Sequence, residues 1–599
     1  MSTFNRYTLV LKVKPPFITQ HLGVLPFGYD NKTLTDDLDY YLIPSTLLKG
    51  HIREELTDIN QQRLANDWFG EEGEHTNDGK SGSIVFATYL KSTEPLSQFA
   101  ERTRVSPTDD QGNIVSSQLQ VSAVADAPAD QDTLDFTLDI VIHDKKARNI
   151  AQQLTDAIKL IHAIGSDKSI GYGVISNVSI DEKVNPEKVV LDQTIHRNIH
   201  NKTIGISIKP HWHFCFPYTE NTHNLVPTLD YIPGSAIKAA FASRLNVRDF
   251  QELFDATTFS HAQPISNDSN KLPRAIAHST VFHQQEIDDY INLAMQEEES
   301  SNHGLLAFQS DWKNAQLEIA KQQNNILTPL KRSVTVRNKH SDNKNAASTG
   351  NLFSLESIDP DQKKGSQPLL WAGTICFPES VSDDAIEHFL SAISNDPILQ
   401  QGLLPKLGKT HTPASFSLHK PFSRTQGISQ RLPKNKLAIT LQSDAWLLNT
   451  DEVNDIDLHD TKALRMAYQT VFDDLFGHDC GLKLEQIYTE EKLAKQNHHW
   501  RNVGKHSTLA SIVLSAEGSV FVFDTNQVSD STTKDVSKLL NESKRLGLPQ
   551  RSCNGYNTED DQQNTFNRHS FKHNRYLREN GYGAISIANG NSSIKLNSI

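Results

Sequence analysis

The 599-residue sequence is poor in cysteine and has no long apolar run. Its four cysteines lie far apart without a C-x-x-C pair, which argues against a disulfide framework and against a structural zinc site built on thiolates. No stretch approaches the roughly 18 consecutive apolar residues that a membrane-spanning helix needs. The N-terminal segment also lacks the apolar run of a signal peptide, so the sequence predicts a cytoplasmic protein with no membrane partner.

Familiar catalytic signatures are missing as well: there is no Ser-His-Asp elbow, no Walker A loop and no Rossmann fingerprint. The net charge of −13 counts against a simple nucleic-acid coat, because phosphate contacts supply most non-specific affinity. Basic residues are nevertheless concentrated in "PLKRSVTVRNKH", "SKRLGLPQR" and "NRHSFKHNRYLR". A basic groove on an acidic body therefore remains compatible with the composition.

What is present is an ordinary globular composition, with 37% hydrophobic and 22% charged residues. The length predicts roughly three or four folded units. Residues 1–182 show the order strand, helix, strands, helix, strand, from the alternating "RYTLVLKVK" to the glycine loop "GSDKSIGYG" and its following strand. This order predicts an α+β fold of the ferredoxin-like or RRM-like type.

The same pattern starts again after a linker at 183–202. "YLIPSTLLKGHIREEL" in the first part is matched by "YIPGSAIKAAFASRL" about 190 residues later, which predicts a domain duplication rather than a solenoid. We expect a second domain at 203–434, with a polar insertion at about 283–350, and a third related unit at 435–599. The predicted architecture is thus a tandem of ferredoxin-like domains with insertions.

Five strings in the first part resemble the RAMP superfamily, the RNA-binding subunits of CRISPR effector complexes: "IPSTLLKGHIREEL", "WFG", "GSIVFATY", "RTRVSPTDDQGN" and "GSDKSIGYG". They are most similar to the backbone subunit of type III complexes, which lines the guide RNA and cleaves target RNA. The part from about 203 onward resembles the type III RAMP subunit that caps the guide at its 5′ tag, through "YIPGSAIKAAFASRL", "NLFSLESI", "LQSDAWLL", "EGSVFVF" and "RLGLPQRSCNGY". The chain as a whole resembles a natural fusion of the two.

The resemblance implies site residues. It places a catalytic aspartate in the loop before the first helix, at Asp30, where a carboxylate would hold a divalent cation, Mg²⁺ or Mn²⁺, or orient a 2′-hydroxyl. Asp36, Asp37 and Asp39 in the same loop are alternatives. Asp30 lies about thirteen residues before Ile43, and the same distance before Ile232 in the second copy reaches Thr219 and Glu220. The lack of an aspartate at that place favours binding without cleavage in the second copy.

RNA contacts are expected at two kinds of position. Lys49 and Arg53 lie four residues apart on one helix face, and glycine loops let a backbone approach a phosphate closely. The full set of expected RNA-binding residues is Lys49, Arg53, Gly165, Lys168, Gly171, Tyr172, Gly173, Lys238, Arg244, Lys544, Arg545 and Arg551. Two departures from the family pattern are Ser45 in place of the glycine of a Pro-Gly-Ser turn, and Ile170 in place of an arginine.

The sequence thus predicts a subunit that binds CRISPR guide RNA and complementary target RNA beside other effector subunits in antiviral defence. One alternative is a non-catalytic scaffold with the same partners. A second is a guide-processing endoribonuclease that uses a histidine among His211, His213, His498 and His499. A third is a protein-interaction adaptor without an RNA role.

Overall fold

The computed structural model describes most of each expected unit. The described residues are 4–19, 28–70, 82–95, 99–105, 119–127, 131–183, 201–217, 224–266, 281–284, 289–292, 330–341, 344–360, 369–422, 436–448, 460–478, 480–495, 511–528, 530–549 and 576–589. No helix within these ranges is long and apolar enough to cross a membrane.

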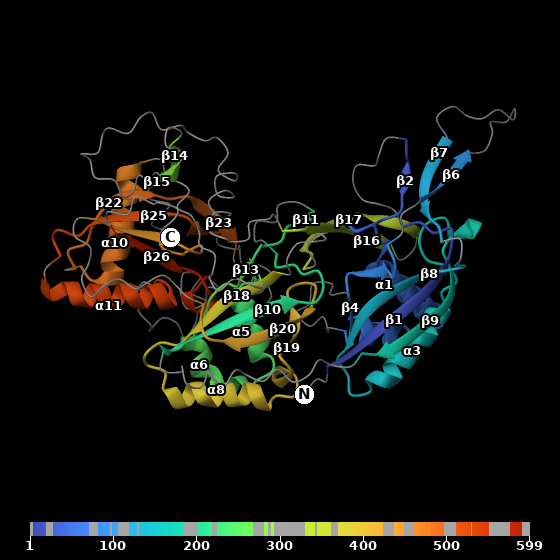
Figure 1. Ribbon diagram of the computed structural model, residues 1–599, viewed down its shortest axis with the longest axis horizontal. Coiled ribbons are helices and arrows are strands. Elements are labelled where there is room, and N and C mark those ends of the chain that lie inside the picture. The colour runs from blue at the N-terminus through green and yellow to red at the C-terminus, as the bar shows by residue number, and fades with distance from the viewer. Residues whose placement is uncertain are drawn as a thin grey trace, which may run out of the picture.

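Three ferredoxin-like sheets follow one another along the chain, each covered by helices (Figure 1). The first has the strand order β3-β5-β8-β1-β9, with β4 also paired to β8, and its β1–β8 and β1–β9 pairs are antiparallel. Its elements are β1 (Asn5–Lys14), β3 (Leu42–Pro44), α1 (Ser45–Asp58), α2 (Gln62–Phe69), β4 (Ile84–Phe86), β5 (Tyr89–Ser92), β8 (Leu134–Ile142), α3 (Ala147–Lys159), the 3₁₀ turn η1 (Lys168–Ile170) and β9 (Val174–Glu182).

The second unit repeats this plan with the order β12-β18-β10-β20-β19, and β13 also pairs with β18. Its elements are β10 (Thr203–Pro210), α5 (Gly234–Ala242), α6 (Val247–Ala256), β12 (Thr258–Phe259), β13 (Gln263–Ser266), β18 (Leu369–Cys376), α8 (Asp383–Asn395), η4 (Leu399–Gln401), β19 (Leu403–Leu407) and β20 (Thr412–His419).

The third unit has the order β22-β25-β21-β26. Its elements are β21 (Lys436–Leu441), α10 (Thr461–Phe476), β22 (Lys483–Tyr488), β25 (Val520–Asp524), α11 (Asp530–Leu546), η7 (Arg578–Asn580) and β26 (Ile585–Asn589). The α+β, ferredoxin-like fold class predicted from the sequence is therefore confirmed.

Each unit carries a β-hairpin inserted in the chain between two strands of its sheet, namely between β5 and β8, between β13 and β18, and between β22 and β25. These hairpins are β6 (Phe99–Val105) with β7 (Leu119–Ala125), β16 (Arg332–Ser341) with β17 (Lys344–Ile358), and β23 (Glu491–Lys495) with β24 (Ser511–Ser515). In the first two units a short strand joins in parallel, β2 (Asn31–Lys32) on β7 and β11 (Leu225–Val226) on β17. A further pair, β14 (Val281–Gln284) with β15 (Asp289–Asn292), precedes the second hairpin.

The expected polar insertion at 283–350 thus contains part of a regular hairpin. Its strand β16 contains the β-branched run Val334–Val336, which suits a pleated surface despite the low hydrophobicity of the segment. Of the remainder, 293–329 lie outside the described residues, as do 184–200 of the expected linker.

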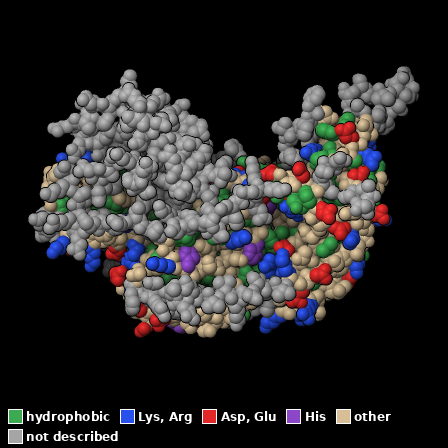
Figure 2. Space-filling view, in the orientation of Figure 1, with side chains coloured by type: hydrophobic (Ala, Val, Ile, Leu, Met, Phe, Trp, Pro, Cys, Tyr) green, Lys and Arg blue, Asp and Glu red, His purple; other side chains and the backbone are tan. Residues whose placement is uncertain are grey.

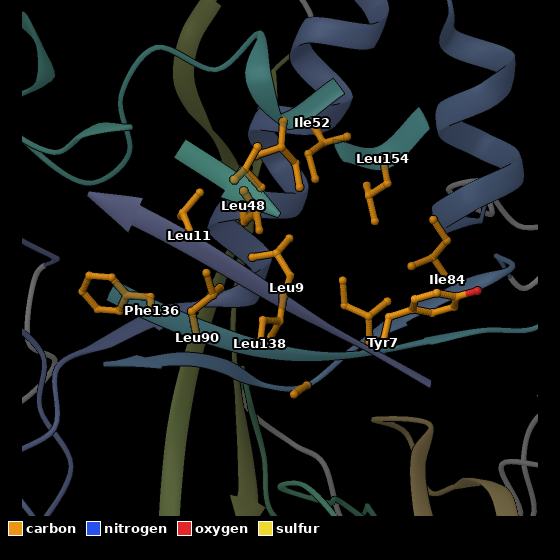
Figure 3. Packing of buried hydrophobic residues seen from close by; sticks show 14 of the residues in the cluster. Tyr7, Leu9, Leu11, Leu48, Ile52, Ile84, Leu90, Phe136, Leu138 and Leu154 are labelled. Carbon is orange, nitrogen blue, oxygen red and sulfur yellow. The ribbon is translucent and has the colours of Figure 1, made fainter. Parts of the chain in front are cut away.

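Alternation along β1 builds the first core. Its burial pattern places Leu9, Leu11 and Val13 on the face covered by α1 and α3, where the four-residue spacing of Leu48 and Ile52 meets them (Figure 3). All five side chains are fully buried. The cluster continues into the second unit, because it also contains three of that unit's side chains, namely Trp212, Ile398 and Leu403.

Polar contacts complete the junction of the first and second units. The Tyr89 hydroxyl lies 3.1 Å from that of Thr335 on β16, and Lys331 Nζ lies 3.7 Å from an Asp37 carboxylate oxygen. In Figure 1 the β16–β17 hairpin lies between the two units, whereas β6–β7 extends away from the first.

Candidate nucleic-acid interface

Asp30 lies directly before β2 and is fixed by two hydrogen bonds to one residue. Its N–H donates to the Val121 carbonyl at 2.8 Å, and its Oδ2 accepts from the Val121 N–H at 2.7 Å. The residue is exposed, so a ligand has access to the carboxylate. Among the described residues no group of three or more His, Cys, Asp or Glu side chains is arranged to hold a metal ion. Asp30 is thus an exposed carboxylate whose place is set by the backbone of Val121.

The alternative aspartates serve the protein's own structure. Asp36 Oδ1 accepts from the N–H groups of Leu38 and Tyr40, and its Oδ2 pairs with Lys91 at 2.7 Å. Asp37 faces Lys331 across the junction with the second unit. These contacts are those of a turn and of a packing surface.

Lys49 and Arg53 share one helix face, as their spacing predicts, and both reach the end of α2. Lys49 Nζ donates to the Phe69 carbonyl at 3.3 Å and lies 5.2 Å from that ring's centroid. Arg53 donates to the Gly70 carbonyl and to Asn66 Oδ1. Both side chains thus satisfy backbone carbonyls at a helix C-terminus, where cations are stabilising.

The first glycine loop, residues 165–173, is tightly packed at its two ends and open to solvent in its middle. A Cβ at Gly165 or Gly173 would meet the backbone carbonyl oxygen of Ile18 at 2.5 Å or of Ile164 at 2.0 Å, so both glycines permit close packing inside the unit. Gly171, at φ +89°, faces open space, and Lys168 before it is exposed. Tyr172 is half-buried. The accessible part of the loop is therefore its 168–172 segment.

The sequence reasoning passed over two arginines on β6, of which Arg104 reaches this loop. Arg104 pairs with Asp167 at 3.0 Å, and Arg102 pairs with Asp126 at 3.6 Å. Both guanidinium side chains are about half exposed, at 53% and 52%. Alternation in "RTRV" was the available signal, because it places both on one face of a strand. We call Arg102, Arg104 and Lys168 the hairpin–loop strip.

Acidic and basic side chains are interspersed over the first unit on the face drawn in Figure 2. Pairing of the strip arginines with Asp126 and Asp167 is part of this mixture. Exposed ion pairs contribute only about 0–1 kcal/mol each, so phosphate oxygens can replace these carboxylates at small cost.

The third unit has a loop of the same design in a different environment. "GYGAIS" at 581–586 repeats "GYGVIS" at 171–176, and Gly581 and Gly583 have left-handed φ values of +96° and +69°. This loop is packed on the second unit: a Cβ at Gly581 would meet His261 Nδ1 at 2.7 Å, and a Cβ at Gly234 would meet the Asn580 carbonyl oxygen at 2.7 Å. The loop that is open in the first unit is closed in the third.

The expected binding residues of the later units are also drawn into packing. Arg545 donates to the Phe377 carbonyl at 2.6 Å and pairs with Glu379 at 3.0 Å. Burial lowers the pKa of Lys238, with the carboxylates of Glu579 and Asp255 acting in the opposite direction. Lys544 is half-buried in the last turn of α11, and Arg551 lies outside the described residues.

Arg244 is a structural residue. It forms an ion pair with Asp396 at 2.8 Å, and both side chains are only 5% exposed. Such a guanidinium has little surface to offer a phosphate, so the burial of Arg244 and its ion pair argue against the expected RNA contact at this residue.

The paired histidines after β10 lie at the junction of the first two units. His211 Nε2 is 2.7 Å from the Ser415 hydroxyl, and burial, followed by the Arg6 charge, lowers the pKa of His211 to about 4. His213 lies 3.6 Å from Asp359 and packs edge-on against Tyr89. Their surroundings are those of an interface; His498 and His499 lie outside the described residues.

The sheet order, the inserted hairpins and the exposed loop together define the class: tandem ferredoxin-like domains, of which the first presents an open glycine loop that carries Lys168. The model of the RAMP superfamily matches residues 22–176, and the first unit is a RAMP-superfamily domain. No curated protein matches the chain.

Two solved structures illustrate the similarity. One is a cryo-EM structure of the type III-B Cmr-beta bound to cognate target RNA, with 14% identity and a TM-score of 0.24 over 30% of this chain and 61% of that chain. The other is the type III-B Cmr-beta in the apo state, with 10% identity and a TM-score of 0.22 over 30% of this chain and 97% of that one. The alignment to the first thus spans less than two thirds of its length.

Proposed function

We propose that this chain is a guide-RNA-binding subunit of a type III-like CRISPR effector complex. Its first unit would cleave complementary target RNA in antiviral defence, and its later part would cap the 5′ tag of the guide, as a natural fusion of two subunits. The RAMP match to residues 22–176 supports the assignment. The observation that carries RNA binding is the exposed glycine loop of the first unit beside Arg102 and Arg104 of the projecting hairpin.

The electrostatics are compatible with a net acidic chain. Phosphate contacts act locally, because charges separated by more than about 8–10 Å are largely screened at physiological salt. The hairpin–loop strip supplies three cationic groups from two segments. Guide–target pairing would read the sequence, while the protein reads backbone and shape.

The glycine loop is open in the first unit and packed in the third, so the two units are proposed to have different roles. Backbone-type RNA contacts are assigned to the first unit, whose loop is open. The capping role of the later part rests on its resemblance to the capping subunit. Guide RNA, target RNA and other effector subunits are the expected partners.

Cleavage is assigned to Asp30 with a divalent cation, Mg²⁺ or Mn²⁺. Such a cation would supply charge stabilisation at the scissile phosphate, and Asp30 would hold it or orient the attacking 2′-hydroxyl. The attachment of Asp30 to Val121 suits a positioning role, since its backbone N–H donates to the Val121 carbonyl and one carboxylate oxygen accepts from the Val121 N–H.

The first experiment is to co-express the chain with a CRISPR array and its neighbouring genes, purify the complex and sequence the bound RNA. Guides with one uniform 5′ tag are expected. Bulk cellular RNA, or none, would instead favour the adaptor alternative.

Cleavage is tested in the same complex with Asp30→Asn, which keeps an acceptor oxygen for Val121 and removes the charge. Loss of target cleavage with unchanged guide content is expected. Asp58→Ala, at the exposed end of α1, is the matched control and should cleave normally.

A non-catalytic scaffold with the same partners is the second candidate, and the absence of a metal-binding group among the described residues favours it. It predicts that the wild-type complex binds target RNA and leaves it intact at any concentration of Mg²⁺ or Mn²⁺.

A further inference from the structure

His51, on α1, reaches the first glycine loop and contacts it through its ring. Its Nε2 lies 3.4 Å from Lys168 Nζ, and its Nδ1 lies 3.3 Å from Glu54 Oε2 one turn further along the helix. The His51 side chain is 14% exposed, whereas that of Glu54 is 64% exposed and Lys168 is exposed. The imidazole therefore lies at the rim of the surface, between an anion and a cation.

Hydrogen-bond chemistry fixes which ring nitrogen carries the proton. A lysine ammonium only donates, so Nε2 must accept from Lys168, and Nδ1–H then donates to Glu54. Burial, followed by the Lys168 charge, lowers the pKa of His51, and the opposing effects of Glu54 and Glu55 are smaller. His51 is thus a neutral ring at pH 7, with a lone pair directed at the loop.

The loop holds Lys168 in a defined place. The 3₁₀ turn that begins at Lys168 is bounded by two left-handed residues, Asp167 at φ 58° and Gly171 at φ 89°. Asp167 is in turn paired with Arg104 of the hairpin. A continuous series of contacts therefore runs from β6 through the loop to His51 on α1.

A cationic donor next to a neutral acceptor matches the phosphate and the neighbouring 2′-hydroxyl of a ribonucleotide. A phosphate takes the N–H groups of Lys168 more strongly than a neutral imidazole does, because the phosphate oxygen is an anion and adds ion pairing to the hydrogen bond. Nε2 is then left to accept from another donor. In a ribonucleotide the ribose 2′-hydroxyl lies close to the phosphate and can donate; in DNA it is absent.

We propose that Lys168 and His51 form a ribonucleotide-binding site, in which Lys168 binds a backbone phosphate and His51 Nε2 accepts from the neighbouring ribose 2′-hydroxyl. This site gives the first unit its preference for RNA over DNA. The inference rests on the proposed function, because it needs RNA to lie on the hairpin–loop strip.

The test is a binding measurement on the full-length complex, by fluorescence anisotropy, with guide strands that each carry one 2′-deoxy nucleotide. In the wild type we expect one deoxy position, or a regularly spaced set, to weaken binding by roughly 2–12-fold, the range of one hydrogen bond. His51→Ala should bind the all-ribose strand more weakly and lose this deoxy penalty. His51→Gln offers an amide oxygen as acceptor and should keep part of it.

Two controls separate a local effect from misfolding or from loss of charge. His162→Ala removes an exposed histidine of the same unit and should retain the full deoxy penalty. Lys168→Ala should weaken ribose and deoxy strands and lower the salt dependence of binding. Circular dichroism spectra of the variants report whether the fold is kept.

The outcomes are distinct for the two claims. A complex that binds no RNA at all refutes the proposed function and this site with it. RNA binding with an identical deoxy penalty in wild type and His51→Ala overturns the site alone.

Discussion

The ion pair of Arg244 and Asp396 offers the sharpest test of packing against binding. Arg244, two residues after the end of α5, contacts Asp396, which follows α8, at 2.8 Å. Asp396 Oδ1 also accepts from the N–H groups of Ile398 and Leu399, at 2.9 Å each. The carboxylate therefore joins α5, the end of α8 and the start of η4 in one buried network.

Arg244→Ala leaves that carboxylate buried without its cation. Removing one partner of a buried pair costs about 3–5 kcal/mol, because an uncompensated charge stays in the interior. For a unit of roughly 150–250 residues, 1 kcal/mol shifts Tm by about 2–4 °C. Loss of the guanidinium should therefore lower the Tm of the second unit by roughly 6–20 °C.

Differential scanning calorimetry of the full-length protein measures this shift. Arg248→Ala, an exposed arginine on the neighbouring helix α6, is the matched control and should change Tm little. Arg244→Met combined with Asp396→Asn should recover part of the loss, since no charge then remains buried and the asparagine still accepts from the backbone. If Arg244→Ala melts like Arg248→Ala but binds RNA more weakly, the guanidinium contacts RNA and the structural reasoning is wrong.

Three further outcomes are expected. The folded-state pKa of His211, about 4, lies below the unfolded value of about 6.5, so the stability that the neutral ring contributes is present above pH 6.5 and is lost as pH falls towards 4. The loss amounts to roughly 3 kcal/mol. His211→Gln should therefore reduce the change in Tm between pH 7.5 and pH 4.5 in thermal melts. Gly234→Ala should unfold or separate the later units, because its Cβ would lie 1.8 Å from the Phe259 carbonyl oxygen, whereas Gly171→Ala should cost only about 1–2 kcal/mol, for its left-handed φ, in urea denaturation. Chelation of divalent cations should stop target cleavage by the complex and leave its guide RNA bound, as gel analysis of both RNAs would show.

The order of elements in the first unit was predictable from local patterns. Alternation in β1 and the four-residue spacing of Leu48 and Ile52 are signals within a few residues of each other, and both describe the same core. The restart of the pattern after residue 200 was predictable for the same reason. The paired strands at 332–341 and 344–350, inside the expected polar insertion, were missed because their low hydrophobicity resembles that of a loop.

Site residues were harder to predict, because their roles depend on partners far along the chain. No local sequence pattern around Arg244 predicts its pairing with Asp396, which lies 152 positions away. Arg545 similarly finds Phe377 and Glu379 in the preceding unit. A basic residue on a helix has the same local sequence whether it faces solvent or a neighbouring unit, so charge alone could not separate binding from packing.

The comparison of the two Gly-Tyr-Gly loops extends this argument to motifs. Gly171 and Gly581 share their sequence neighbourhood and their left-handed backbone, yet one faces open space and the other packs on His261. The difference follows from the second unit's Gly234, which admits the Asn580 carbonyl oxygen where a Cβ would exclude it; the first helix has Ser45 at the corresponding turn. Ser45 replaces the glycine of the Pro-Gly-Ser turn at the start of α1, where no carbonyl oxygen of the described residues approaches as the Asn580 oxygen approaches Gly234. An open loop can meet a ligand and a closed one cannot, so the same repeated motif supports a binding role in the first unit and a structural role in the third.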